Sequence, residues 1–317
     1  MRAARGARPI DMSRPTVAVG VHLGLMATMV VWALNVTIVK WLTGGMDVTL
    51  VASLRMVFAF VVLFVFLLAS GQRFPRWRGT TLALALLAAM LMVYANQMLF
   101  AAAMDRTTAS NAALILALNP LLNALLEASV FRKRLTAPFV IGALLAVAGV
   151  SMVILNRPGA AFAAPTLGDV LVLASMVAFA TGVLIVQRLV RDHSAQEINA
   201  FLYLAGTCAL VLHTVATVPS PAMAIQSLSL LEWAGVAFSG AVATAMGAIA
   251  WTRGVAAMGL GRAAVYMSWV PVLGVAFAAL LLGEGLTVWH FFGSVLVLSG
   301  TVLSSERFRQ LTPLSGR

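Results

Sequence analysis

Long apolar runs alternate with short polar or basic segments along the whole chain. Each run is about 20 residues, the length that an α-helix needs to cross a bilayer. A transmembrane barrel would instead alternate apolar and polar positions. The sequence therefore predicts an all-α polytopic membrane protein with ten transmembrane helices. The predicted spans cover residues 18–40, 48–70, 80–103, 108–130, 137–155, 167–188, 196–218, 231–252, 262–282 and 287–304.

Composition supports this prediction and narrows the class of protein. Of the 317 residues, 62% are hydrophobic and 10% are charged, whereas soluble domains have roughly 45–50% apolar and 25% charged residues. The loops are too short for a nucleotide-binding domain, and the chain has no nucleophile elbow, zinc-binding helix motif or phosphate loop. The single cysteine excludes an intramolecular disulfide, and four scattered histidines do not predict a metal site. We therefore expect neither enzyme activity nor a cofactor.

Positive charge predicts orientation rather than nucleic-acid binding. The net charge is +11, but its basic residues are spread thinly between apolar runs. With ten spans and a cytoplasmic N-terminus, seventeen basic residues fall on the cytoplasmic side and three outside, a strong bias of the kind that orients membrane proteins. The first apolar run is too long for a signal peptide and is interpreted as an uncleaved span. We expect a multi-pass inner-membrane protein, embedded in the lipid bilayer, with both termini in the cytoplasm.

The second half of the chain repeats the first at an offset of 151 residues. This offset places Pro120 on Pro271, Gly142 on Gly293 and Gly149 on Gly300. Each half has five spans, and an odd number forces the second half to enter the membrane upside down. Inverted repeats of this kind are typical of transporters, with a site near the membrane midplane. The predicted organisation is a tail at 1–17, repeats at 18–155 and 167–304, and a tail at 305–317.

Several short motifs resemble those of the drug/metabolite transporter superfamily, in its EamA-like branch. They occur in the expected order and cover essentially the whole chain: Trp32-Ala33-Leu34-Asn35, Lys40-Trp41, Ser53-Leu54-Arg55, Leu167-Gly168-Asp169, Pro271-Val272-Leu273 and Leu281–Thr287. The resemblance implies a ten-helix transporter of small metabolites, more often an exporter, with a cavity lined by spans 1, 3, 4, 6, 8 and 9. One position departs from the pattern, because Lys133 stands where the second half has Glu284. We interpret Glu284 as a loop cap or interface anchor.

Span 4 carries a polar stripe. Asn119, Asn123 and Glu127 are spaced by four residues, so they share one helical face that should point into the protein. The amides either line a cavity or form hydrogen bonds between helices. Glu127 is the candidate for proton coupling, although it lies near the cytoplasmic end and could instead pair with Arg132 or Arg134.

Three further features have two interpretations each. Arg55 lies about 10 Å inside span 2, where anchoring is favoured over substrate contact. Pro120 and Pro271 predict either a hinge or a static kink at equivalent positions. The paired glycines predict close helix packing, within the chain or between the protomers of a homodimer. Lys40 is interpreted as an interface lysine.

The predicted substrate site combines aromatic and amide side chains. Trp32 and Asn35 are three residues apart and share a face of span 1. The same spacing joins two pairs on spans 3 and 9, and Trp251 is equivalent to Gln97 at an offset of 154. This mixture suits small organic solutes, although the tryptophans could equally be packing residues or, for Trp251, an interface anchor. The full predicted set is Trp32, Asn35, Tyr94, Gln97, Asn119, Asn123, Trp251, Tyr266 and Trp269.

Together these features predict a secondary transporter that moves a small metabolite, such as an amino acid or a drug-like solute, by alternating access. The direction expected is export. The alternative is a non-transporting protein with the same fold: a scaffold, a sensor or a lipid scramblase. A scaffold would have no reason to keep a polar and aromatic interior.

Overall fold

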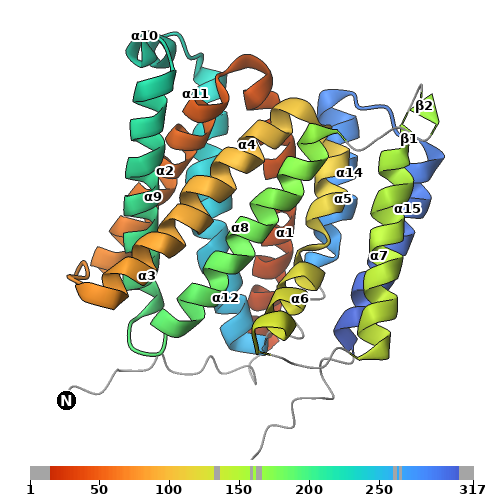
Figure 1. Ribbon diagram of the computed structural model, residues 1–317, viewed down its shortest axis with the longest axis horizontal. Coiled ribbons are helices and arrows are strands. Elements are labelled where there is room, and N and C mark those ends of the chain that lie inside the picture. Colours follow the sequence, from red (N-terminus) through yellow and green to blue (C-terminus); the bar gives the residue numbers. More distant parts are fainter. Residues whose placement is uncertain are drawn as a thin grey trace, which may run out of the picture.

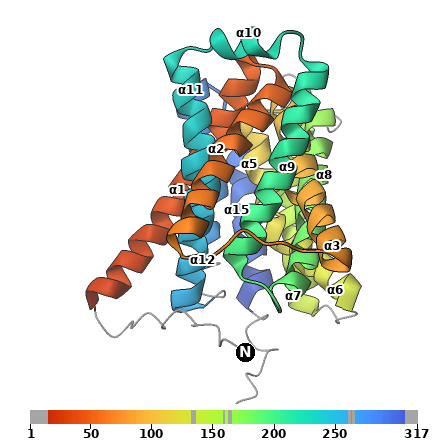
Figure 2. The same cartoon turned by 90° about the vertical axis from the view of Figure 1, so that its left-hand side faces the viewer.

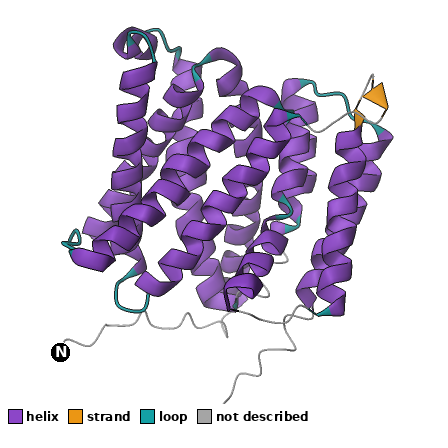
Figure 3. Cartoon of the chain, viewed as in Figure 1, coloured by secondary structure: helices purple, strands orange, loops and turns teal. Residues whose placement is uncertain are grey.

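The computed structural model describes residues 15–131, 136–157, 160–161, 166–259, 263 and 266–306, and nearly all of them are helical (Figure 3). In the first half the elements are α1 (Pro15–Gly45), α2 (Val48–Ala69), α3 (Gly79–Ala89), η1 (Met90–Ala95), α4 (Asn96–Arg106), α5 (Ala109–Leu116), α6 (Asn119–Phe131) and α7 (Ala137–Leu155). A two-residue antiparallel pair, β1 (Asn156–Arg157) and β2 (Ala160–Ala161), follows. The second half has α8 (Leu167–Leu189), α9 (Ala195–Thr217), α10 (Pro221–Gln226), α11 (Leu230–Ala237), η2 (Phe238–Met246), α12 (Gly247–Met258), α14 (Trp269–Leu282) and α15 (Val288–Glu306).

These elements account for all ten predicted spans. Eight continuous helical runs are long and apolar enough to cross a membrane, and two shorter apolar helices, Trp269–Leu282 and Val288–Leu303, occupy the positions of spans 9 and 10. The boundaries agree most closely for span 5, predicted and observed at 137–155. The first span runs five residues beyond its predicted end, to Gly45, and the eighth runs six residues beyond, to Met258.

The inverted repeat is visible in which helices pack together. Equivalent helices of the two halves pair with each other: α2 with α9, α5 with α14, and α7 with α15. A further pair of equivalent contacts is α4 on α8 and α1 on α12 (Figures 1 and 2). Buried apolar side chains form two clusters, one around α1, α5 and α7, the other around α2, α3 and α9. The predicted fold of two five-helix repeats is confirmed.

The equivalent glycines form the contact between α7 and α15. A Cβ atom at Gly149 would lie 2.6 Å from the carbonyl oxygen of Gly293, and a Cβ at Gly300 would overlap the Gly142 carbonyl. Only glycine allows two backbones to approach this closely. The predicted packing role is confirmed, and the contact is made within one chain. The homodimer stays a prediction.

Spans 4 and 9 are interrupted close to their equivalent prolines. The helix of span 4 ends at Leu116 and resumes at Asn119, so Pro120 is in the first turn of α6. Pro271 is likewise in the first turn of α14. Proline fits the first turn of a helix because its missing N–H would have no partner there. The predicted distortion is confirmed as a break; a hinge motion at these points stays a prediction.

Spans 3 and 8 each contain a π-helical segment that the periodicity did not predict. These are η1 and η2, and under the 154-residue offset η1 corresponds to residues 244–249, which overlap the end of η2. Such segments are rare and occur frequently at functional sites. Both lie next to the polar side chains described below.

Candidate functional site

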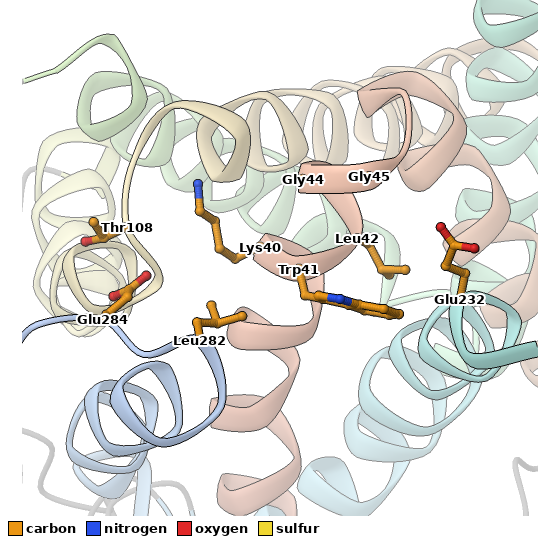
Figure 4. A pocket seen from close by; sticks show the side chains of 9 residues that line it. All are labelled: Lys40, Trp41, Leu42, Gly44, Gly45, Thr108, Glu232, Leu282 and Glu284. Atoms are coloured by element: carbon orange, nitrogen blue, oxygen red, sulfur yellow. The ribbon is translucent and has the colours of Figure 1, made fainter. Parts of the chain in front are cut away.

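A cavity of about 580 Å³ lies where the end of α1 meets α11, α14 and the start of α5 (Figure 4). We call it the Lys40 cavity. It contains one basic and two acidic side chains among mostly small or apolar ones. Its volume is within the range of sites for small organic ligands. The lining residues are Lys40, Trp41, Leu42, Gly44, Gly45, Thr108, Glu232, Leu282 and Glu284.

Lys40, near the end of α1, is partly buried and bonded to a neighbouring helix. Its Nζ donates a hydrogen bond of 2.7 Å to the carbonyl oxygen of Met104, in α4. A lysine ammonium has three protons, so two remain for other acceptors. Lys40 supplies the positive charge of the cavity, and its interpretation as an interface lysine stays a prediction.

Glu284, in the second half, forms hydrogen bonds with the first half beside the same cavity. Its carboxylate accepts hydrogen bonds from the backbone N–H of Ala109, at 2.7 Å, and from the N–H and hydroxyl of Ser110, at 3.0 and 2.7 Å. These are free donors at the first turn of α5, where a negative charge also complements the helix dipole. The interpretation of Glu284 as a cap is confirmed. The helix that it caps, α5, belongs to the other repeat.

Glu232 has only local partners. Its carboxylate accepts hydrogen bonds from the N–H and hydroxyl of Ser229, at 2.7 and 2.6 Å, in a capping box at the start of α11. It lies on the α11 side of the cavity, and Glu284 lies across from it on the α14 side (Figure 4). The cavity thus presents separated charges of both signs.

Deeper along α1, a buried arginine joins three spans. Arg55 is 2% exposed, and its Nε donates to the hydroxyl of Ser239 in η2. The Ser239 hydroxyl in turn donates to Oδ1 of Asn35 in α1. We call these three residues the Arg55 cluster. The guanidinium also lies 6.0 Å from the centroid of the Phe100 ring, a distance suited to cation–π attraction.

Two tryptophans of the predicted site meet beside this cluster. The rings of Trp32 and Trp251 are 5.7 Å apart between centroids. The indole N–H of Trp32 donates to the carbonyl oxygen of Ala243, at 3.0 Å. Trp32, Asn35 and Trp251 are therefore brought together along the contact between α1 and span 8.

The predicted residues of span 3 lie on a different contact. The Tyr94 hydroxyl is 2.9 Å from Nδ1 of His213 in α9. Gln97 donates through Nε2 to the side chain of Asn96, at 2.8 Å, and its buried Oε1 has no partner among the described residues. Asn96 donates to the carbonyl oxygen of Ser175 in α8, at 2.9 Å. These contacts do not join Tyr94 or Gln97 to Trp251.

The remaining predicted residues are dispersed. Tyr266 contacts His22 through its hydroxyl, and Trp269 is 49% exposed. Asn119 and Asn123 are half-buried on α6, and Pro120 is exposed. Glu127 is in α6, but its side chain lies outside the described part of the chain, as do Arg132, Lys133 and Arg134. Three of the nine predicted residues thus lie along the contact between α1 and span 8, Trp32 against Trp251 and Asn35 linked through Ser239 to Arg55. The hydrogen bonds and ring contacts of the described residues do not join the other six to them.

Sequence reasoning missed Ser239 and the partner histidines. Ser239 is in a run of glycine, alanine and serine that indicates only packing, although it connects Arg55 to Asn35. His213 and His22 had no pattern to mark them. The Leu167-Gly168-Asp169 motif did signal a contact: Asp169 is buried, and its carboxylate accepts a 2.6 Å hydrogen bond from the Thr107 hydroxyl between α4 and α5.

Comparison with known proteins agrees with this architecture. A family model described as "EamA-like transporter family" matches the chain twice, at residues 20–155 and 166–306. A crystal structure superposes with a TM-score of 0.67 at 19% identity, covering 92% of this chain and 99% of that chain, which shows a shared fold.

Curated relatives match over most of their length. An uncharacterized transporter, YyaM, of Bacillus subtilis is 24% identical over 79% of this chain and 82% of the relative. A probable amino-acid metabolite efflux pump of Escherichia coli is 27% identical, with 88% and 92% covered. A probable terminal-alkyne amino-acid exporter of Streptantibioticus cattleyicolor is 26% identical, with 87% and 93% covered. The two family matches span nearly the whole chain, and the protein belongs to the EamA-like transporter family.

Proposed function

We propose that this protein is a secondary exporter of small, amino-acid-like solutes across the inner membrane, working by alternating access. The bias of basic residues supports cytoplasmic termini, and in that orientation the Lys40 cavity would open to the outside. Two relatives with probable roles in exporting amino acids or their metabolites support the solute class and direction.

The Lys40 cavity is the observation that carries the proposal. Its volume of about 580 Å³ suits a small solute. An amino acid at neutral pH has one carboxylate and one ammonium group. Lys40 offers protons to the first, and Glu232, on the α11 side, offers a carboxylate to the second. Glu284 is already occupied by the start of α5.

The repeats supply a means of opening and closing the path. Equivalent helices of the two halves pack against one another, and spans 4 and 9 are both interrupted near a proline. In inverted-repeat transporters, one set of helices rocks against the other around a central site, and discontinuous helices form that site. Proton coupling through Glu127 stays a prediction.

The test is a counterflow assay in proteoliposomes. Vesicles containing the purified protein and unlabelled L-leucine should accumulate external labelled L-leucine faster than vesicles without protein. Lys40→Gln should reduce this exchange about tenfold, since it removes one charged contact to the solute. The matched control is Arg106→Gln, which removes an exposed cation paired at 3.2 Å with Asp105 and outside the cavity lining.

Two results would contradict the proposal. One is the absence of exchange for leucine and for a panel of the other amino acids, with the protein folded in the vesicles. The other is movement of fluorescent lipid between leaflets without solute exchange, which would favour the scramblase alternative. Equal loss of exchange in Lys40→Gln and Arg106→Gln would show that the Lys40 cavity has no specific role in binding the solute, although the protein is a transporter.

A further inference from the structure

Arg55 is a buried charge without a counter-charge. Burial of an arginine at membrane depth is costly unless it is paired. Among the described residues the only ion pair is between Asp105 and Arg106, so no described carboxylate neutralises Arg55. Its Nη1 atom is buried and has no hydrogen-bond partner. Its neighbours are instead the Ser239 hydroxyl, the Phe100 ring and the phenol of Tyr203 in α9.

The partners of Arg55 fix its position but do not satisfy it. The Ser239 hydroxyl accepts from Nε and donates to Asn35, so its single proton is already used. This arrangement orients the guanidinium through Nε and leaves Nη1 for an acceptor. Asn35 is only partly buried, and its Nδ2 has no hydrogen bond to another described residue. Two donors on different helices, joined through Ser239, thus have no hydrogen-bond partner among the described residues.

A carboxylate is the ligand that these donors fit best. Guanidinium groups bind carboxylates through short, charge-assisted hydrogen bonds. A carboxylate would also supply the negative charge that the described residues around Arg55 lack. An uncharged acceptor such as a carbonyl would fill the hydrogen bond but leave the buried charge uncompensated.

The cluster is positioned below the Lys40 cavity. Asn35 precedes Trp41 by six residues on α1, which corresponds to about 9 Å along the helix. Trp41 packs against Gly235, four residues before Ser239, where an added Cβ would lie 3.0 Å from the indole ring. The contact between α1 and α11 at Trp41 therefore separates the cavity from the cluster. Lys40 and Arg55 are successive positive charges on the two sides of this contact.

We propose that the Arg55 cluster is the carboxylate-binding site of the transport path, with Arg55 and Asn35 binding the solute carboxylate and Ser239 positioning the guanidinium. The inference rests on the proposed function, because it takes the solute to be an amino-acid-like anion or zwitterion. It adds a second carboxylate contact, at Arg55, to the contact that the proposed function gives to Lys40 in the cavity.

The experiment compares L-leucine with L-leucinamide, which keeps the ammonium group and lacks the carboxylate. Each is tested as a competitor of labelled L-leucine counterflow, with labelled L-leucinamide measured directly. The wild type should prefer leucine at least tenfold. Arg55→Gln should lose that preference by losing leucine transport, and leucinamide transport should change less than about threefold, because no charged contact to it is removed.

A second variant covers the case in which Arg55→Gln does not fold. Ser239→Ala keeps the charge and removes its orienting partner, so leucine exchange should fall severalfold with a smaller effect on leucinamide. A purely structural Arg55 would reduce both solutes equally. In addition, leucine should raise the thermal unfolding midpoint of the detergent-solubilised wild type, and this shift should be absent in Ser239→Ala.

The outcomes separate the two proposals. Leucine transport by the wild type with an unchanged leucine-to-leucinamide preference in both variants would overturn the assignment of Arg55 and leave the proposed function intact. Equal loss of both solutes in the variants would also overturn it. A wild type that neither transports nor is stabilised by any amino acid would overturn the proposed function and the carboxylate site with it.

Discussion

Two contacts related by the inverted repeat hold the central helices, and they differ in charge. On one side, α1 and α2 pack on η2 in span 8; on the other, α8 and α9 pack on η1 and α4 in span 3. The first contains Arg55, bonded to Ser239 and through it to Asn35. In the second, the hydrogen bonds of the described residues include Asn96 to the Ser175 carbonyl and Tyr94 with His213, and no arginine or lysine takes part in them. The same arrangement of helices therefore contains a buried charge in the first contact and a structural hydrogen-bond contact in the second.

The comparison shows that the two repeats share the packing of their helices, whereas the polar and charged side chains at equivalent contacts can differ. Both contacts have a π-helical segment and a glycine at a tight approach. Only one has a buried cation, and that contact lies nearer the cavity. Paired substitutions, one in each contact, measure how differently the two contacts contribute to stability and to transport.

The largest effect is expected from Gly240→Ala compared with Gly182→Ala. The new methyl group at Gly240 would overlap the backbone oxygen of Arg55, which cannot move without shifting α2 against η2. At Gly182 it would overlap Cγ of the Met92 side chain, which can relieve the overlap by changing rotamer without a shift of the backbone. We expect losses of about 3 kcal/mol and about 1 kcal/mol in unfolding free energy, respectively. Denaturation in detergent measures both, and equal losses would show that the two contacts are equally rigid.

An intermediate effect is expected from replacing the amides. Asn35→Ala removes a donor from the proposed carboxylate site, so leucine exchange should fall about tenfold. Asn96→Ala removes a hydrogen bond to a helix backbone, which costs roughly 0.6 kcal/mol of stability in a membrane protein. Its leucine exchange should stay within about twofold of wild type. Counterflow and thermal unfolding are measured on both variants; a greater loss of exchange in Asn96→Ala would place the solute on the span 3 side.

The smallest effect is expected from removing one aromatic donor on each side. Trp32→Phe removes the indole bond to Ala243, and Tyr94→Phe removes the hydroxyl contact to His213. Each should cost roughly 0.6 kcal/mol, seen as a small decrease in the unfolding midpoint. Because neither contact involves a charge, the two losses should agree. A large difference between them would mean that one aromatic residue has a role beyond packing.

The sequence predicted features that depend on neighbouring residues and missed those that depend on distant ones. Span length, the prolines and the paired glycines follow from local hydrophobicity and backbone geometry, and the structure confirms them. Glu284 as a cap was also predictable, because it departs from its first-half equivalent. Ser239 was not, since its role depends on partners 184 and 204 positions away.

The predicted substrate site illustrates the same limit. Helical spacing put Trp32 and Asn35 on one face, and both do meet span 8. The same argument put Tyr94 beside Gln97, but their partners are in α9 and α4 itself. Spacing within one helix says which side chains share a face; it does not say which neighbour that face meets. That information comes only from how the ten spans are arranged.

The glycine contact between α7 and α15 has a consequence for biogenesis. These helices form a pair at one edge of the bundle (Figure 1), and α15 is synthesised after α7 because it follows α7 in the chain. Until Gly293 and Gly300 enter the bilayer, the surface of α7 around Gly142 and Gly149 lacks the partner that fills it. The first repeat therefore completes its packing only after α15 of the second repeat has been synthesised.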